Sequence, residues 1–292
     1  MKRLLTSLAA ALALFACQAE PEKPEAPAGY PALWEISTAD GQVEGWLFGT
    51  VHALPDDVAW QSPRLRQVIA NADMLVVEVA NLDDGPALSK LFEDMAFDHP
   101  GGPIRQRIAP QLRGEFDKLL VKASVRRSYF DPMESWAAAL ALAQVAQDGE
   151  SENGADRALI SEFGNREIVE LEGARAQLAI FDGLPELEQR DLLNAVLHET
   201  AEYGDQSGEV AQAWGSGKLD ELARVSQRGI LADRELRQAL LIDRNAAWTA
   251  QLENLLSARE RPLVAVGAGH LLGPDGLPAR LEKDGYTVRR VD

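Results

Sequence analysis

Two apolar runs near opposite ends of the chain stop at a glycine and are followed three residues later by a histidine. Residues 46–49 lead to His52, and residues 262–267 lead to His270. An apolar run that stops at Gly is typical of a β-strand that turns sharply, because Gly tolerates backbone angles that are closed to other residues. Both histidines are therefore predicted to lie at the carboxyl edge of a sheet.

A third apolar run, residues 74–79, is continuous, as in a parallel strand that is covered on both faces, and it carries Glu78 near its end. A buried carboxylate is costly unless it is paired or bound to a metal. One histidine after a strand is more often a capping or core residue, but two of the four histidines in this chain share the same spacing. Two imidazoles and a carboxylate commonly bind a divalent transition metal, so a site of His52, Glu78 and His270 is predicted.

The rest of the pattern predicts an α/β fold. Residues 33–37 and 44–49 flank the dipeptide Asp40-Gly41, which favours a tight turn and so predicts an opening β-hairpin. A helix over residues 63–72 joins this hairpin to the strand of Glu78. Helical patterns then cover residues 111–123, 133–147, 155–163, 186–203, 231–257 and 274–283, and a last strand covers residues 286–291. We expect a central mixed β-sheet formed from both ends of the chain and a large helical insertion that forms a wall or lid.

Three further polar residues, one after a predicted strand and two in a predicted helix, are candidate site residues. A short strand over residues 167–171 delivers Glu172, which either orients a ligating imidazole or caps the following helix. The longest helical pattern contains Arg244 and Asn245. Arg244 never loses its charge, so it either stabilises an oxyanion or clamps a substrate carboxylate, or it makes an ordinary helix salt bridge.

These residues also carry a family resemblance. The segments LWEIS, GWLFGTVHALP, LVVEV and LVAVGAGHLLGPDGLPARLEKDGYTV, spread over residues 33–291, resemble the TraB/GumN family. Its relatives include the Tiki metalloproteases and pheromone-shutdown proteins and, more remotely, erythromycin esterases and haem-binding ChaN. The resemblance implies a catalytic or metal site built from the two motif histidines and the strand glutamate. It also covers Glu172 and the pair Arg244-Asn245, where the family has a glutamate and an Arg-Asn pair.

The start of the chain is typical of a secreted protein. Residues 1–3 are basic at two positions, and residues 4–15 are apolar but too short to span a bilayer comfortably, which predicts a secretory signal. The signal ends in Leu-Phe-Ala-Cys, which resembles the lipobox of bacterial lipoproteins. Cys17 is the only cysteine and has no internal disulfide partner, so we expect it to be lipidated. The alternative is an ordinary cleaved signal with a coincidental cysteine.

Composition then divides the chain into three expected parts. They are a lipoprotein signal peptide (residues 1–16), the lipidated Cys17 with a Pro- and Glu-rich tether to residue 32, and an α/β domain (residues 33–292). Gln18 resembles the residue of lipoproteins sent to an outer membrane, so we expect a periplasm-facing anchor there. The net charge of −17 argues against nucleic acid as a partner and leaves the lipid as the means of membrane contact.

The leading functional expectation is a metal-dependent hydrolase acting on peptide bonds. Its divalent ion, which the ligand types allow to be Mn, Co or Zn, would lower the pKa of a bound water and polarise the scissile carbonyl. Glu78 or Glu172 would act as general base, and Arg244 would stabilise the oxyanion. The sequence contains neither a His-Glu-x-x-His zinc motif nor a Gly-x-Ser-x-Gly elbow.

Three alternative hypotheses about the function remain. A metal-free hydrolase would use His52 and Glu78 as an acid/base pair, as in an esterase. A lipid-anchored binding protein would capture a peptide or a haem-like ligand in the same pocket without turnover. A degenerate site would leave His52 and His270 with a role in stability only. Residues 267–269 lack the third glycine of a dinucleotide motif, so no nucleotide cofactor is expected.

Overall fold

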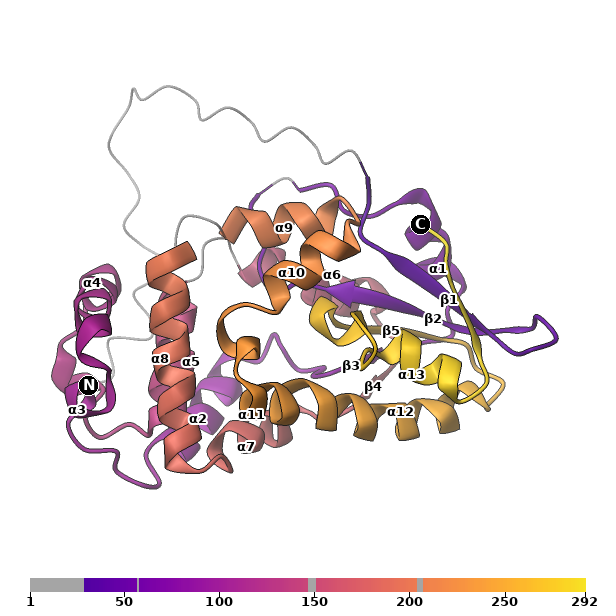
Figure 1. Cartoon of the computed structure of the whole chain (residues 1–292). Helices are drawn as coiled ribbons and strands as arrows, with labels where there is room; N and C mark the ends of the chain where they lie inside the picture. The colour runs from indigo at the N-terminus through magenta and orange to yellow at the C-terminus, as the bar shows by residue number, and fades with distance from the viewer. Residues whose placement is uncertain (1–28, 57, 147–150, 204–206) are drawn as a thin grey trace, which may run out of the picture.

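The computed structural model describes residues 29–56, 58–146, 151–203 and 207–292. The predicted signal peptide, Cys17 and most of the predicted tether lie outside the described residues. Within them, a mixed β-sheet is flanked by helices, and a separate helical block lies beside it (Figure 1). The predicted α/β fold with a helical insertion is confirmed.

The sheet interleaves the two ends of the chain. Its strands are β1 (Leu33–Ser37), β2 (Val43–Thr50), β3 (Met74–Val77), β4 (Glu167–Glu170), β5 (Pro262–Gly267) and β6 (Thr287–Arg290). Their order across the sheet is β4-β3-β5-β2-β1-β6. Strands β4, β3, β5 and β2 are parallel, whereas β1 is antiparallel to both β2 and β6. The carboxyl ends of β2, β5 and β3 therefore lie side by side at one edge, where sheet proteins of this type place their sites.

The glycines of the first hairpin and of the first motif have different structural roles. Gly41 has φ +88°, a left-handed conformation that the predicted turn requires and that Gly adopts at no steric cost. At Gly49 the chain instead needs space, since a Cβ there would lie 3.0 Å from both Cα and Cβ of Ala268. The glycine of the first motif thus allows β2 to approach the turn that carries the second motif.

The described helices lie on the two faces of the sheet or in the insertion. They are α1 (Pro63–Asn71), α2 (Gly85–Ala96), α3 (Ile104–Arg107), α4 (Arg113–Ala123), α5 (Ser135–Ala146), α6 (Ala155–Phe163), α7 (Ala174–Asp182), α8 (Glu186–Tyr203), α9 (Ser207–Gly215), α10 (Leu219–Ser226), α11 (Arg234–Arg237), α12 (Asp243–Leu256) and α13 (Leu277–Lys283). Helices α1 and α6 pack on one face of the sheet, and α12 and α13 pack on the other. Helices α2, α4, α5 and α8 share a core of their own around Trp136 and Phe116, and they form the insertion (Figure 1).

The longest helical pattern differs from the expectation of one helix over residues 231–257. A 3₁₀ turn (Gly229–Ala232) and α11 come first, then a π-helical turn (Gln238–Ile242), and only then α12. The physical reason is that this segment serves two cores. Leu236 belongs to the core of the insertion, whereas Trp248 belongs to the core under the sheet. The extra residue of a π turn changes which helix face packs inward, so that the segment before the turn contacts the core of the insertion and α12 contacts the core next to the sheet. Such turns are frequent at functional sites.

The described helices include none that is long and apolar enough to cross a bilayer.

Candidate active site

Glu78 follows β3 directly and is buried, and both of its carboxylate oxygens are bonded. Oε1 accepts a hydrogen bond from the backbone N–H of Gly267 (2.7 Å). Oε2 accepts from Nε2 of Gln177 on α7 (2.9 Å) and from Nη2 of Arg244 on α12 (2.6 Å). The partner that a buried carboxylate needs is therefore a guanidinium from a helix that the sequence places 166 residues away.

The charges around Glu78 outweigh its burial. Burial is the largest single influence and by itself raises the pKa of this carboxyl group. The interactions with His270, which is cationic at the low pH where Glu78 titrates, with Arg244 and with His52, together with the N–H of Gly267, lower its pKa to about 2. Glu78 is therefore ionised at neutral pH.

Arg244 is the centre of this cluster, and all five of its N–H groups are bonded. Nε and Nη2 donate to the two oxygens of Glu172 (both 2.9 Å), and Nη2 also donates to Glu78. Nη1 lies 3.2 Å from the carbonyl oxygen of Leu240 and 3.2 Å from Nε2 of His270. Only 10% of the Arg244 side chain is exposed. Arg244 thus makes the salt bridges that the sequence left open as an alternative, but it makes them inside the predicted site.

Glu172, two residues after the end of β4, is a member of the cluster and does not cap the next helix. Its Oε1 accepts a hydrogen bond from Nε1 of Trp248 (3.0 Å) in addition to the bonds from Arg244. The N-cap position of α7 is taken by Gly173, and no side chain caps that helix end. Glu172 therefore bonds to Arg244 and Trp248, and among the described residues its side-chain hydrogen bonds include neither a histidine ring nor the start of α7.

His270 lies in a 3₁₀ turn (Ala268–Leu271) after β5, and Asn245 fixes the position of its proton. Nδ2 of Asn245 donates to the carbonyl oxygens of His270 (3.2 Å) and Asp275 (2.9 Å), so its Oδ1 must face Nδ1 of His270 (2.7 Å). Nδ1 therefore carries the proton, and the lone pair of Nε2 faces Arg244. Burial, together with neighbouring cations, lowers the pKa of His270 to about 4, so the ring is neutral at pH 7.

His52 stands apart from this saturated cluster. It follows β2, its side chain is 65% exposed, and its Nδ1 lies 2.6 Å from Oδ2 of Asp156. The hydrogen bond to Asp156 is the largest influence on this ring and raises the pKa of His52, with the charges of Asp156 and Glu78 acting in the same direction. Nε2 is hydrogen-bonded to none of the described residues.

Asp156 is a site residue that the sequence reasoning missed. It lies in the first turn of α6, where an aspartate is usually explained by the helix dipole. Its burial, with 8% exposed, is the signal that distinguishes it. Gly154 permits the contact, because a Cβ there would lie 2.6 Å from Oδ1 of Asp156 and 2.6 Å from the carbonyl oxygen of His52.

The three residues predicted to share a metal ion lie at one edge of the sheet, but they face different partners. Glu78 and His270 direct donor atoms to the guanidinium of Arg244, and His52 pairs with Asp156. Across the parts of the chain that the structure describes, no three His, Cys, Asp or Glu side chains are grouped so that they could hold a metal ion. As arranged here, the residues do not fit a divalent ion, and the Mn, Co or Zn site stays a prediction.

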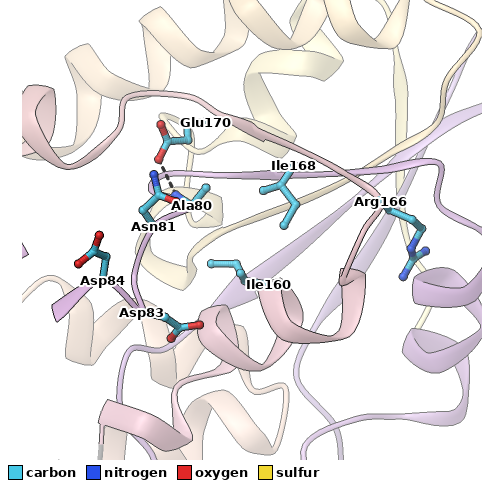
Figure 2. A pocket seen from close by; sticks show the side chains of 8 residues that line it. All are labelled: Ala80, Asn81, Asp83, Asp84, Ile160, Arg166, Ile168 and Glu170. Carbon is cyan, nitrogen blue, oxygen red and sulfur yellow. Dashed lines mark hydrogen bonds between the residues drawn. The ribbon is translucent and has the colours of Figure 1, made fainter. Parts of the chain in front are cut away.

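A cavity of about 720 Å³ opens beside the edge strand β4 (Figure 2). Its lining is formed by Ala80, Asn81, Asp83, Asp84, Ile160, Arg166, Ile168 and Glu170. Glu170 accepts a hydrogen bond from the N–H of Ala80 (2.7 Å), and this bond closes one wall of the cavity. Since Glu170 and Ala80 are each two residues from a glutamate of the cluster, the cavity adjoins the candidate site without containing it.

Fold and site together define an α/β protein whose Gly-x-x-His motifs meet at one sheet edge, around a buried cluster of two glutamates, an arginine and a histidine. The chain belongs to the TraB/PrgY/gumN family, whose model matches residues 32–290. Similar proteins are the Uncharacterized protein YbaP of Shigella flexneri and that of Escherichia coli (strain K12). Each is 26% identical over 251 residues, which cover 84% of this chain and 90% of the relative. No solved structure matches the chain.

Replacing Asp156 with Asn is expected to lower the pKa of His52. The carboxylate stabilises the imidazolium form, so its loss favours the neutral ring and moves the titration midpoint to lower pH. Proton NMR of the His52 ring against pH measures this shift. Asp117→Asn, which removes an exposed carboxylate paired with Arg105, is the control and leaves the midpoint in place. An unchanged midpoint in Asp156→Asn would contradict the assigned pair.

Proposed function

We propose that the protein is a hydrolase that cleaves ester or peptide bonds, with His52 as its acid/base group. One observation carries this proposal: Asp156 holds Nδ1 of His52, whose side chain is mostly exposed and interacts electrostatically with Glu78 and Arg244 of the buried cluster. An imidazole oriented by a carboxylate through one nitrogen, with the other nitrogen open, is the arrangement that general acid/base catalysis requires. This corresponds to the metal-free form of the expected hydrolase, with Asp156 in the role of orienting carboxylate.

The proposed reaction needs water as its nucleophile. Nε2 of His52 takes a proton from a water molecule while the water oxygen bonds to the substrate's carbonyl carbon, and the carbonyl electron pair moves onto oxygen. His52 then returns the proton to the leaving oxygen or nitrogen as its bond to carbon breaks. Asp156 and Glu78 stabilise the imidazolium that exists between these steps, in agreement with their effect on the pKa of His52.

The proposed role of Arg244 as oxyanion stabiliser has a structural condition. Because all five N–H groups are bonded, the oxyanion must displace one existing acceptor. The contact from Nη1 to His270 (3.2 Å) goes to an uncharged acceptor, whereas Nη2 donates to the carboxylates of Glu78 (2.6 Å) and Glu172 (2.9 Å). We therefore assign the Nη1 side of the guanidinium to the substrate oxygen.

Replacing His52 with Ala is expected to lower kcat by about 10²- to 10⁴-fold, the usual contribution of a positioned acid/base group. Turnover is measured with quenched fluorescent peptides and with chromogenic esters. In the wild type the rate rises with pH through the raised pKa of His52, since the base must be deprotonated, and Asp156→Asn moves that rise to lower pH. His198→Ala, at an exposed position on α8 beside Glu202, is the matched control.

The alternative of a binding protein makes the opposite prediction in the same assay. A protein that only captures its ligand retains it stoichiometrically and releases no fragments over repeated cycles. Full turnover in His52→Ala, or retention of intact ligand by the wild type, would contradict the proposed hydrolase.

We also propose that lipidation of Cys17 holds the domain at the periplasmic side of the outer membrane. The proposal is supported by the lipobox-like sequence before Cys17 and by Gln18 after it. Cys17→Ser is expected to lose incorporation of labelled fatty acid and to move from the membrane fraction to the soluble periplasmic fraction. Membrane recovery of Cys17→Ser equal to that of the wild type would contradict the anchor.

A further inference from the structure

Three side chains that could coordinate a metal ion through a lone pair contact the Arg244 guanidinium. Each of them follows the end of a different strand. Glu78 follows β3, Glu172 follows β4 and His270 follows β5, and each has an atom 2.6–3.2 Å from a guanidinium nitrogen. Two carboxylates and a neutral imidazole are a donor set that suits Mn, Co or Zn. The cluster thus has the donor types of a metal site, but as arranged around the Arg244 side chain these groups could not hold a metal ion.

Each donor is also held from behind, as metal ligands are. Gln177 donates to Glu78 (2.9 Å), and Trp248 donates to Glu172 (3.0 Å). Asn245 accepts the Nδ1 proton of His270 and so leaves the Nε2 lone pair directed inward. Supporting contacts of this kind orient ligands and fix the histidine tautomer in metal centres. Here they orient the same kinds of groups towards Arg244.

Charge explains why the guanidinium and a divalent ion exclude each other. The two carboxylates and the guanidinium sum to a single negative charge. A guanidinium stays charged at any accessible pH, so it cannot yield its place by losing a proton. A divalent ion added beside it would meet a like charge, and the inward lone pairs of Glu78, Glu172 and His270 would already be bonded to N–H groups.

We propose that Arg244 is the built-in cation of this site. The wild-type protein therefore binds no divalent ion between Glu78, Glu172 and His270, and an uncharged residue at position 244 converts the cluster into a transition-metal site. In that variant the carboxylates of Glu78 and Glu172 and Nε2 of His270 are released from their bonds to the guanidinium and bind the ion, and a divalent ion offsets the two carboxylate charges. The inference concerns ion binding and does not depend on turnover.

Arg244→Met in the full chain tests this, because Met keeps much of the side chain's bulk and removes its charge and donors. After treatment with chelator, wild type and variant are titrated with Co²⁺, followed by visible absorption, and with Zn²⁺, followed by calorimetry. We expect Arg244→Met to bind about one ion per chain, and at least about tenfold more tightly than the wild type. Adding His270→Ala to this variant is expected to abolish the binding.

Two control variants separate charge from general disturbance. Arg237→Met removes a guanidinium seven residues earlier that pairs with Asp275 outside the cluster, and it is expected to gain no ion. Arg244→Lys keeps a positive charge at the centre and is expected to gain none either. Should Arg244→Met fold only poorly, its thermal unfolding with and without Zn²⁺ decides: an increase in Tm supports the proposal, and no increase contradicts it.

Binding of an ion by the wild type that His270→Ala abolishes would overturn the proposal, as would an Arg244→Met variant that binds no better than the wild type. Neither result decides the proposed hydrolase, which is judged by turnover in the His52→Ala comparison. Conversely, a wild type without turnover leaves the ion-binding inference standing.

Discussion

The structure depends on the burial of one guanidinium between two carboxylates. Arg244, Glu78 and Glu172 each have side chains that are about nine-tenths buried. Removing such charges from water costs several kcal/mol per ion, which is recovered only when the geometry is good and the remaining donors and acceptors are satisfied. Every N–H of Arg244 is bonded, and all the acceptors except the carbonyl oxygen of Leu240 follow the ends of three parallel strands. The parallel arrangement of β3, β4 and β5 is therefore what makes this buried pairing possible.

Around this constraint, the site divides into a fixed part and an open part. The fixed part is the buried cluster, whose helix α12 reaches it through a π turn that connects two hydrophobic cores. The open part is His52, held through one ring nitrogen by Asp156 and exposed through the other. A group that transfers a proton to or from a substrate needs an atom that is not already hydrogen-bonded. Because all N–H groups of Arg244 are bonded, a substrate can bind to the cluster only by replacing an existing hydrogen bond. This difference is the reason why we propose proton transfer at His52 and a role in electrostatics and positioning for the cluster.

The sequence predicted local features well because strand and helix periodicity and glycine turns are local. The strands around Glu78 and His270, the hairpin at Asp40-Gly41 and the helical insertion follow from such patterns. Asp156 lies 104 residues from its partner His52, so no local pattern could pair them. The sequence also did not predict the π turn, because the apolar stripe of residues 231–257 is continuous although it contributes to two cores. Family resemblance indicated Arg244 and Asn245, but their contacts follow only from the packing of α12 against the sheet.

The position of the proton on His270 tests the guanidinium-centred cluster most directly. Long-range ¹H–¹⁵N spectra of the wild-type protein distinguish the two neutral tautomers and the imidazolium. The account predicts a neutral ring at neutral pH, protonated on Nδ1 towards Asn245, that gains its second proton only near pH 4. A proton on Nε2, or an imidazolium at neutral pH, would mean that Nε2 does not accept from Arg244, and it would contradict the account.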